Sequence, residues 1–339
     1  MRIVVVGATG NIGTALLRRL GSQPEVSSVL GIARRLPATR EPYDGAEWSA
    51  VDVGTPDAAV QLARAFEGAD AVVNFAWALQ PNHDERAMYR TNVTGLVNVL
   101  AAAGAAGVAQ VVHASSIAAY SPGPKTRVDE VWPTGGIQTS HYGRHKAIGE
   151  RLLDTFAAAN PSIAVTRLRP GFVFQEDAGR EIRILFLGRW LPFAPLIAAH
   201  LPALTIPRQI IGQAVHADDA AAAFWLAIEH RAAGAFNIAA EPVLGPDEIA
   251  RGLNAARAVH VPLGLARAVV HATWLARLHR TDPGWLDVAA SVPLMSMARA
   301  REVLGWVPRV SATDALTETT LAMAERHGVQ ASPALWDAS

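Results

Sequence analysis

The sequence predicts an α/β fold, with a doubly wound parallel sheet followed by a smaller, mainly helical C-terminal region. Short apolar and β-branched runs alternate with helix-forming stretches from the N-terminus to about residue 174. That spacing is typical of parallel strands with helices on both faces of the sheet. Half of the 339 residues are apolar and 18% are charged, so the chain can bury a large core.

The first element is a β-branched strand over residues 2–6, which suits burial on both faces, and a helix follows over residues 15–20. Gly7, Gly10 and Gly13 lie between them. Glycines at these spacings permit a tight turn, let backbone N–H groups approach a pyrophosphate and let the helix pack closely on the strand. We therefore predict a dinucleotide-binding loop. Its expected contacts are Gly7, Thr9, Gly10, Asn11, Ile12 and Gly13.

The second strand is predicted over residues 26–33, and Arg34 and Arg35 follow it directly. In dinucleotide-binding folds an acidic residue at this point bonds the ribose hydroxyls, and here it is missing. Two guanidinium groups suit the 2′-phosphate of NADP, which they can bind in charge-assisted pairs. We expect NADP as cofactor, with NAD as an alternative. The other interpretation is that both arginines are solvated loop residues.

Three further strands are predicted at residues 47–53, 69–76 and 109–116, with helices at 57–66 and 92–103. Ligands collect at the carboxyl ends of parallel strands. The residues there are expected to contact the cofactor, and Asp52 could accept hydrogen bonds from the adenine amino group. These expected contacts are Asp52, Val53, Phe75, Ala76 and Trp77.

Tyr142 and Lys146 are four residues apart in a stretch with helical character up to Asn160. At that spacing both side chains lie on one helix face. A lysine ammonium beside a phenol, together with an oxidised nicotinamide, favours the phenolate and lowers the tyrosine pKa. Tyr142 could then donate or remove the proton of a carbonyl or alcohol while a hydride moves to or from the cofactor.

These motifs resemble those of the extended short-chain dehydrogenase/reductase superfamily, in its NAD-dependent epimerase/dehydratase group. The resemblance covers nearly the whole chain and is more specific for the superfamily than for a substrate. The matching segments are GATGNIG (7–13), NFAW (74–77), NVTG (92–95), SSIAAY (115–120), YGRHK (142–146), LRPGFVF (168–174), VHADDAAAA (215–223) and LGWVP (304–308).

The resemblance implies a Rossmann domain and a role for several of these residues. Tyr142 would be the catalytic acid/base, and Lys146 its partner that also holds the nicotinamide ribose. Ser116 would bond the reacting oxygen, with Ser115 as the alternative. Pro170 and Val173 match positions that lie against the nicotinamide. Asn92 matches an asparagine near the active site that would contact the cofactor, although Asn92 could equally pack or cap a helix. The family also suggests a homodimer formed through the helices around Asn92 and Tyr142.

The chain departs from the sugar-nucleotide enzymes of this family. Their diphosphate-binding arginine, four residues before the histidine of VHADD, is Gly212 here, and a frequent asparagine after LRP is Phe172. Arg208 is the one candidate to replace the missing cation. We assign residues 1–174 to cofactor binding, with 213–235 returning to that domain. Residues 175–212 and 236–339 form the predicted substrate-binding region, which is rich in apolar side chains: Phe186, Trp190, Leu191, Phe193, Leu196, Trp274, Leu275, Leu278 and Trp285.

Residues 190–207 contain no Asp, Glu, Lys or Arg and approach the length of a membrane span. Four prolines interrupt them, at ~3 kcal/mol each in a helix interior, which argues against a spanning helix. We expect an apolar lid over the substrate pocket, with ordinary core or a peripheral membrane contact as alternatives.

Other kinds of site are disfavoured by the sequence. His216, Asp218 and Asp219 fit no standard metal spacing, so no metal is expected and the two aspartates are predicted to cap a helix over 220–229. His113 is expected to be a satisfied core histidine. There is no Gly-x-Ser-x-Gly elbow and no cysteine, and 30 basic residues balance 30 acidic ones, which gives no support for nucleic-acid binding. The N-terminus lacks signal-peptide character, so we expect a cytoplasmic protein.

The sequence therefore predicts an NADP-preferring oxidoreductase. It would transfer a hydride between nicotinamide and a carbonyl or secondary alcohol of a largely apolar small molecule, with Tyr142 as acid/base. Two alternatives stay open. One is a nucleotide-sugar epimerase or dehydratase with tightly held NAD, and the other is a non-catalytic NADP-binding sensor.

Overall fold

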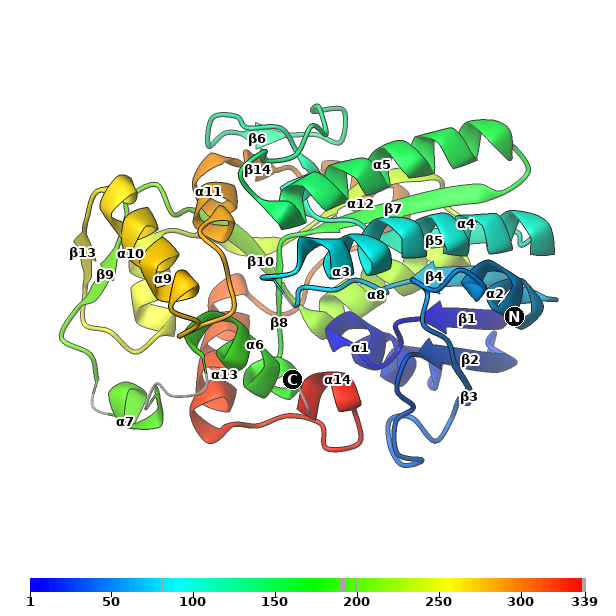
Figure 1. Cartoon of the computed structure of the whole chain (residues 1–339), viewed down its shortest axis with the longest axis horizontal. Coiled ribbons are helices and arrows are strands. Elements are labelled where there is room, and N and C mark those ends of the chain that lie inside the picture. Colours follow the sequence, from blue (N-terminus) through cyan, green and yellow to red (C-terminus); the bar gives the residue numbers. More distant parts are fainter. Residues whose placement is uncertain (81, 189–192, 199, 337–339) are drawn as a thin grey trace.

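The computed structural model describes residues 1–80, 82–188, 193–198 and 200–336. A seven-stranded parallel sheet in the order β11-β7-β5-β4-β1-β2-β3 forms the centre of the described chain (Figure 1). Its strands are β1 (Arg2–Val6), β2 (Ser28–Ala33), β3 (Glu47–Ala50), β4 (Ala71–Asn74), β5 (Gln110–Ala114), β7 (Ala164–Pro170) and β11 (Gly234–Ile238). The predicted α/β fold with a parallel sheet is confirmed.

Helices cover both faces of this sheet. One face carries α1 (Asn11–Leu20) and α8 (Ala217–Glu229), and the other carries α2 (Ala58–Phe66), α4 (Gly95–Ala106) and α5 (His141–Ala159). The alternation of side chains along β1 shows why. Ile3 and Val5 belong to the core under α1 and α8, whereas Val4 and Val6 belong to the core under α2 and α4. A strand buried on both faces must be apolar at every position.

A second region is built mainly from chain beyond residue 171 and lies to one side of the sheet (Figure 1). Its strands are β8 (Phe172–Phe174), β10 (Gly212–His216) and β12 (Ala240–Leu244) in one sheet, with β9 (Leu204–Ile206) paired to β13 (Ala258–His260) and β14 (Leu294–Met295) paired to β6 (Arg127–Val128). Its helices are α6 (Gly179–Leu187), α7 (Phe193–Ala198), α9 (Pro246–Gly252), α10 (Leu263–Leu275), α11 (Gly284–Ser291), α13 (Ala312–Glu325) and α14 (Pro333–Trp336). α12 (Ala298–Leu304) instead packs on β11 and α8 of the large sheet. Within 213–238 the chain runs back to the large sheet, because α8 packs on α1 and β11 pairs with β7.

The end of one predicted strand is wrong. The strand predicted over 47–53 ends at Ala50, and Asp52 instead closes a turn by accepting the Gly54 N–H at 2.9 Å. The helix predicted over 92–103 is confirmed, and the helical stretch begins earlier than expected. It consists of α3 (Glu85–Tyr89), a π-helical turn at Arg90–Thr94 and α4 from Gly95.

The predicted caps of α8 are also wrong. His216 is the N-cap and accepts the Asp218 N–H, whereas the Asp219 carboxylate accepts backbone N–H groups from Arg309 and Val310 at 2.8 and 2.9 Å. Asp219 therefore anchors the chain after α12 and does not cap its own helix.

The apolar segment 190–207 is described in part, and Trp190, Leu191 and the side chain of Leu196 lie outside the described residues. Phe193 and Ile197 of α7 are buried against Met323 of α13. These two side chains are therefore core, whereas Ala194, Pro195 and Ala198 of the same helix are exposed. The lid over the substrate pocket stays a prediction. None of the described helices combines the length and apolar character that crossing a bilayer requires.

Candidate active site

A cavity of about 380 Å³ lies at the carboxyl ends of β1, β4 and β5 and extends to α6 and α11. Fourteen of the sequence-predicted site residues line it. They are Gly10, Asn11, Ile12, Gly13, Arg34, Arg35, Phe75, Ala76, Trp77, Ser116, Tyr142, Lys146, Pro170 and Val173. Segments that are far apart in the sequence therefore meet at one site.

The glycine loop fits the pyrophosphate of a dinucleotide. A Cβ on Gly13 would lie 2.7 Å from the Gly7 and Ala8 carbonyl oxygens, so only glycine permits the close approach of α1 to the loop. A Cβ on Gly10 would meet only one atom, the Gly7 oxygen at 3.5 Å, which leaves this side of the loop open. α1 also begins without a side-chain cap and without an acidic residue in its first turn. Its N-terminal N–H groups and positive dipole end can therefore receive an anion.

Gly7 and Thr9 are not part of the described cavity wall, but they fix the conformation of the glycine loop. Gly7 has φ +79°, and a Cβ there would lie 2.6 Å from the Ala76 nitrogen after β4. Thr9 is buried, and its carbonyl accepts the Ser332 hydroxyl at 2.7 Å. The C-terminal segment thus fastens the loop from the other side, and nothing in the local sequence pattern indicated this contact.

Arg34 and Arg35 both line the cavity at the end of β2, and both are exposed. Arg35 donates to the carbonyl of Pro333 in α14 at 2.8 Å. Among the described residues Arg34 has no hydrogen-bond or ion-pair partner. Arg34 is therefore the freer of the two cations to bind an anion.

Asp52, Val53 and Asn92 do not line the described cavity wall. Asp52 closes the turn after β3, and Val53 is buried. The Asn92 side chain accepts the Ala78 N–H at 2.6 Å and donates to the Ala78 carbonyl at 2.9 Å. Asn92 thus fixes the loop after β4, which carries Trp77, and acts on the cavity only through that loop.

The Ser116 hydroxyl acts on the Tyr142 phenol, since hydrogen bonding by Ser116 lowers the pKa of Tyr142. Ser116 caps the 3-10 turn Ile117–Ala119 and accepts the Ala118 N–H at 3.1 Å, which fixes its hydroxyl at the end of β5. Ser115 instead donates to the Glu150 carboxylate at 2.5 Å. The two serines therefore differ, because the Ser115 hydroxyl is engaged by Glu150 and that of Ser116 is directed to Tyr142.

Lys146 lies one turn after Tyr142 on α5, with its ammonium 5.6 Å from the centre of the Tyr142 ring. Its Nζ donates to the Ala114 carbonyl at 2.7 Å and lies 3.5 Å from the centre of the Trp77 ring. Burial lowers the pKa of Lys146 to about 7, and the nearby Glu150 carboxylate opposes this shift. Lys146 is thus a buried cation held by one carbonyl and one aromatic face.

Burial raises the pKa of Tyr142 to about 12, although the hydrogen bond from Ser116 acts in the other direction. This differs from the sequence expectation of a lowered tyrosine pKa. Lys146 alone does not overcome desolvation of the phenolate. Any lowering must come from the positive charge of an oxidised nicotinamide, which was the other half of that expectation.

A buried charge network lies beneath these groups. Glu150, one turn after Lys146, accepts from Arg169 Nε and Nη2, both at 2.8 Å, and from Arg167 at 3.1 Å. Arg169 also donates to the hydroxyl of Tyr120 at 2.9 Å. Burial alone would raise the pKa of Glu150, but the two arginines and Ser115 lower it to about 2. The network ties α5 to β5 and β7 beneath Tyr142 and Lys146, and sequence analysis did not identify it.

The far end of the cavity is aromatic. Trp285 stacks on Tyr142 with ring centres 4.8 Å apart, and Phe186 meets Trp285 edge-on at 5.5 Å. Phe172 lies 6.2 Å from Trp285, and a Cβ on Gly212 would lie 3.8 Å from the Phe172 ring. The position at which sugar-nucleotide enzymes carry an arginine therefore borders an aromatic surface. Arg208, the candidate replacement, is exposed and lies outside the described cavity wall.

Glu181 is a polar group of the cavity wall that sequence analysis missed. It lies on the first turn of α6, and among the described residues its carboxyl group has no hydrogen-bond or ion-pair partner. Burial raises the pKa of Glu181 to about 7. An unpaired carboxyl group facing a cavity can contact a bound molecule.

His113 is buried and lies within hydrogen-bonding distance of the Asn74 side chain, at 3.2 Å. Burial lowers its pKa to about 3, so it stays neutral. The prediction of a satisfied core histidine is confirmed.

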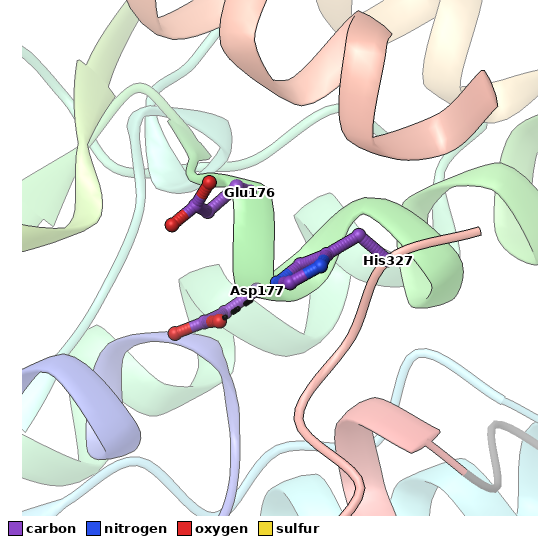
Figure 2. Close-up of side chains that lie close together, drawn as sticks. All are labelled: Glu176, Asp177 and His327. Atoms are coloured by element: carbon purple, nitrogen blue, oxygen red, sulfur yellow. Dashed lines mark ion pairs between the residues drawn. The ribbon is translucent and has the colours of Figure 1, made fainter. Parts of the chain in front are cut away.

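Glu176, Asp177 and His327 form a cluster of potential metal ligands (Figure 2). The Asp177 carboxylate pairs with Arg18 and also with His327, the latter at 3.4 Å. Glu176 and His327 are exposed. Because an arginine already neutralises the central carboxylate, surface ion pairing accounts for this cluster.

Comparison with known proteins places these features in a family. Residues 3–186, more than half of the chain, match the NAD dependent epimerase/dehydratase family. L-arabinose 1-dehydrogenase (NAD(P)(+)) of Haloferax volcanii is 30% identical over 191 residues, which are 53% of this chain and 70% of that protein. A 4-hydroxy-2-methyl-3-oxo-4-farnesyl-3,4-dihydroquinoline-1-oxide ketoreductase of Stigmatella aurantiaca is 29% identical over 178 residues, 52% of each chain. The chain thus spans about half of the ketoreductase, and it spans 31% of several mycobacterial relatives.

The fold is shared with solved structures. The UDP-glucose 4-epimerase of Thermotoga maritima, solved with UDP-glucose, superposes with a TM-score of 0.72. The match covers 96% of this chain and 99% of that one at 18% identity, a likeness that concerns the fold alone.

Proposed function

Because the chain belongs to the NAD dependent epimerase/dehydratase family, we propose that it is an NADP-preferring oxidoreductase acting on a carbonyl or secondary alcohol of a largely apolar small molecule. The relatives and solved structures compared above are an NAD(P)-dependent dehydrogenase, a ketoreductase and an epimerase. The cofactor preference and the substrate class are our proposals. They rest on Arg34 and on the aromatic end of the cavity.

The cofactor would lie along the glycine loop, with Lys146, Pro170 and Val173 at its nicotinamide end. When bound, it supplies or accepts the hydride. The Ser116 and Tyr142 hydroxyl groups both line the cavity, and both offer contacts to one reacting oxygen. In reduction, Tyr142 gives its proton to the carbonyl oxygen as the hydride reaches the carbonyl carbon.

The acid–base properties of the site favour the reductive direction. A Tyr142 phenol with a pKa of about 12 is protonated at neutral pH and is ready to donate. As the proton leaves, the Lys146 ammonium, 5.6 Å from the ring centre, stabilises the phenolate. The Glu150–Arg169 network beneath α5 holds both groups in place, because Glu150 lies one turn after Lys146.

The NADP preference rests on charge at the end of β2. No carboxylate stands where it would bond the ribose hydroxyls, and Arg34 has no partner among the described residues. A dianionic 2′-phosphate there would form charge-assisted hydrogen bonds with it. Such bonds contribute about 1.5–3 kcal/mol, or roughly tenfold to a hundredfold in affinity.

The substrate class rests on one observation, the aromatic wall formed by Phe172, Phe186 and Trp285 beside Tyr142. A pyranose or a diphosphate would need more hydrogen-bonding partners than this wall offers. The ketoreductase relative is named for a farnesyl-bearing ketone, which is the kind of apolar carbonyl compound that such a wall accepts.

The test begins with titration of purified protein by NADPH and NADH. Wild type should bind NADPH more tightly, and Arg34→Ala should weaken NADPH tenfold to a hundredfold while leaving NADH unchanged. Arg40→Ala is the matched control, because Arg40 is exposed in the same loop but lies outside the described cavity wall. Equal affinities, or equal effects of both variants, would contradict the NADP proposal.

The second arm is a screen of apolar ketones with NADPH. Tyr142→Phe should abolish turnover and keep NADPH binding. NAD that copurifies and does not exchange would instead favour a nucleotide-sugar epimerase or dehydratase. NADPH binding without turnover of any ketone, and with no effect of Tyr142→Phe on any activity, would favour the sensor alternative.

A further inference from the structure

The helix α10 (Leu263–Leu275) exposes an apolar face. None of its residues is buried, and Leu265, Val269 and Leu275 are 57%, 54% and 60% exposed. Exposed alanines at 268, 272 and 276 fill the spaces between them, and the face continues to Leu278, which is 54% exposed. Positions three and four apart lie on one side of a helix. Soluble monomers rarely expose apolar residues in such a continuous stripe, and a stripe of this kind marks an interaction site.

Two chain segments, one that contains α10 and one that pairs with it, have arginine as their only charged residue type apart from histidine. Residues 182–217 and 249–281 contain eight arginines and no Asp, Glu or Lys, although the whole chain has 30 acidic and 30 basic residues. The two segments meet in space, because β9 pairs with β13. In Figure 1 β9, β13, α7 and α10 of these segments lie together with α9 in a lobe on the side away from β1.

Two of these arginines are available at the surface beside α10. Arg257 and Arg277 flank α10, are exposed and have no ion-pair partner among the described residues. Arg251 is instead paired with Glu248 at 2.7 Å, and Arg267 with Asp287 at 3.0 Å. The acids that border the lobe in sequence are thus partly neutralised by arginines, which leaves the α10 face apolar with a cationic edge.

We propose that α10 and its flanking arginines dock on the surface of an anionic phospholipid membrane. The helix would lie in the plane of the interface, with Leu265, Val269 and Leu275 in the headgroup and acyl boundary. Arg257 and Arg277 would meet lipid phosphates. A second protein copy would leave two arginine-rich surfaces facing each other, with Arg257 and Arg277 unpaired on each, which like-charge repulsion opposes.

The proposed docking helix is followed directly in the sequence by residues that line the cavity. Arg280 and Trp285, which line the cavity, follow within ten residues of the end of α10. A membrane contact here would bring the aromatic wall close to a source of apolar molecules. The docking proposal does not depend on the proposed activity, and its test uses no substrate.

The experiment is co-sedimentation of the full chain with vesicles of phosphatidylcholine alone, or of phosphatidylcholine with phosphatidylglycerol. Binding should require the anionic lipid and should fall with salt. The double variant Leu265→Glu/Val269→Glu should lose at least tenfold in vesicle affinity. Arg257→Glu/Arg277→Glu should lose more than tenfold, since one basic residue near the surface contributes about fivefold.

Leu321→Glu is the matched control, because Leu321 is 53% exposed on α13, outside the lobe. Circular dichroism spectra and thermal melting establish that each variant is folded. The proposal is overturned if neither vesicle type binds the protein, or if Leu321→Glu weakens binding as much as the α10 variants. It is also overturned if light scattering finds a dimer that dissociates in Leu265→Glu/Val269→Glu, because a second copy would then cover the face.

Discussion

Replacing Glu150 by glutamine should destabilise the fold far more than removing an exposed carboxylate from the same cluster. Glu150 is 1% exposed and bonds Arg169 through both carboxylate oxygens. The protein lowers its pKa from 4.5 to about 2. At about 1.4 kcal/mol for each unit of pKa, the ionised Glu150 contributes roughly 3 kcal/mol to the free energy of unfolding. Glu150→Gln also leaves the buried Arg169 guanidinium without its anion, and breaking a buried pair costs a similar ~3–5 kcal/mol.

The control is Asp154→Asn. Asp154 bonds Arg167 at 2.6 Å, but its side chain is 66% exposed, so the loss should be below ~1 kcal/mol. Urea unfolding at pH 7, followed by tryptophan fluorescence, gives both values. Equal losses in the two variants would refute the reasoning.

The pH dependence supplies an independent check of the same group. The folded-state pKa of Glu150 lies below its unfolded value, so its contribution is complete above about pH 4.5 and is lost as the pH falls towards about 2. Wild-type stability should decline through that window. In Glu150→Gln this part of the decline should be missing. A wild-type stability that stayed constant between pH 4.5 and 2.5 would refute the assignment even if the variant failed to fold.

Three further predictions concern the cavity. Gly13→Ala should weaken NADPH binding at least tenfold in a fluorescence titration, because its Cβ would lie 2.7 Å from two backbone oxygens, whereas Gly45→Ala, with no atom within 4 Å, should be neutral. Glu181→Gln should remove a dependence of KM on pH near 7 with little change in kcat, because burial raises the pKa of that carboxyl group to about 7; an unchanged KM profile would contradict this. Lys146→Met should lose turnover, yet its melting temperature at pH 7 should be no lower than that of the wild type. Burial lowers the pKa of Lys146 to about 7, so the charged lysine destabilises the folded state. As the pH rises from 7 towards 10 the folded-state lysine is neutral, and the stability of the wild type should increase relative to that of the variant.

The parts of the site that could be predicted lie where local pattern and strand topology agree. The glycine loop, Arg34 and Ser116 each follow an apolar strand, and the carboxyl ends of parallel strands meet at one edge of the sheet. Tyr142 and Lys146 share a helix face through their spacing alone. That these residues would meet around one cavity could therefore be predicted without knowledge of tertiary contacts.

The parts that could not be predicted depend on partners distant in sequence. Asp219 looks like a helix cap, but it binds the backbone of Arg309 and Val310, about ninety residues further on. Ser332 fastens the glycine loop through the Thr9 carbonyl, across 323 residues. No periodicity or cap rule carries such information, because each contact exists only after the two regions have packed together.

The two halves of the cavity are held by different forces, and this bears on how such a site can change. The half that contains Tyr142 and Lys146 rests on hydrogen-bonded charges, since Glu150 and Arg169 hold α5 against β7 beneath Lys146. The other half rests on aromatic contacts of Phe172, Phe186 and Trp285. Apolar packing tolerates exchanges of similar volume, whereas a buried ion pair does not tolerate the loss of one member. Substitutions at the aromatic wall can therefore alter the substrate while leaving the positions of Ser116, Tyr142 and Lys146 intact. Gly212, where the resemblance to sugar-nucleotide enzymes led us to expect an arginine, is a position of this kind, because it borders the Phe172 ring on the aromatic side of the cavity.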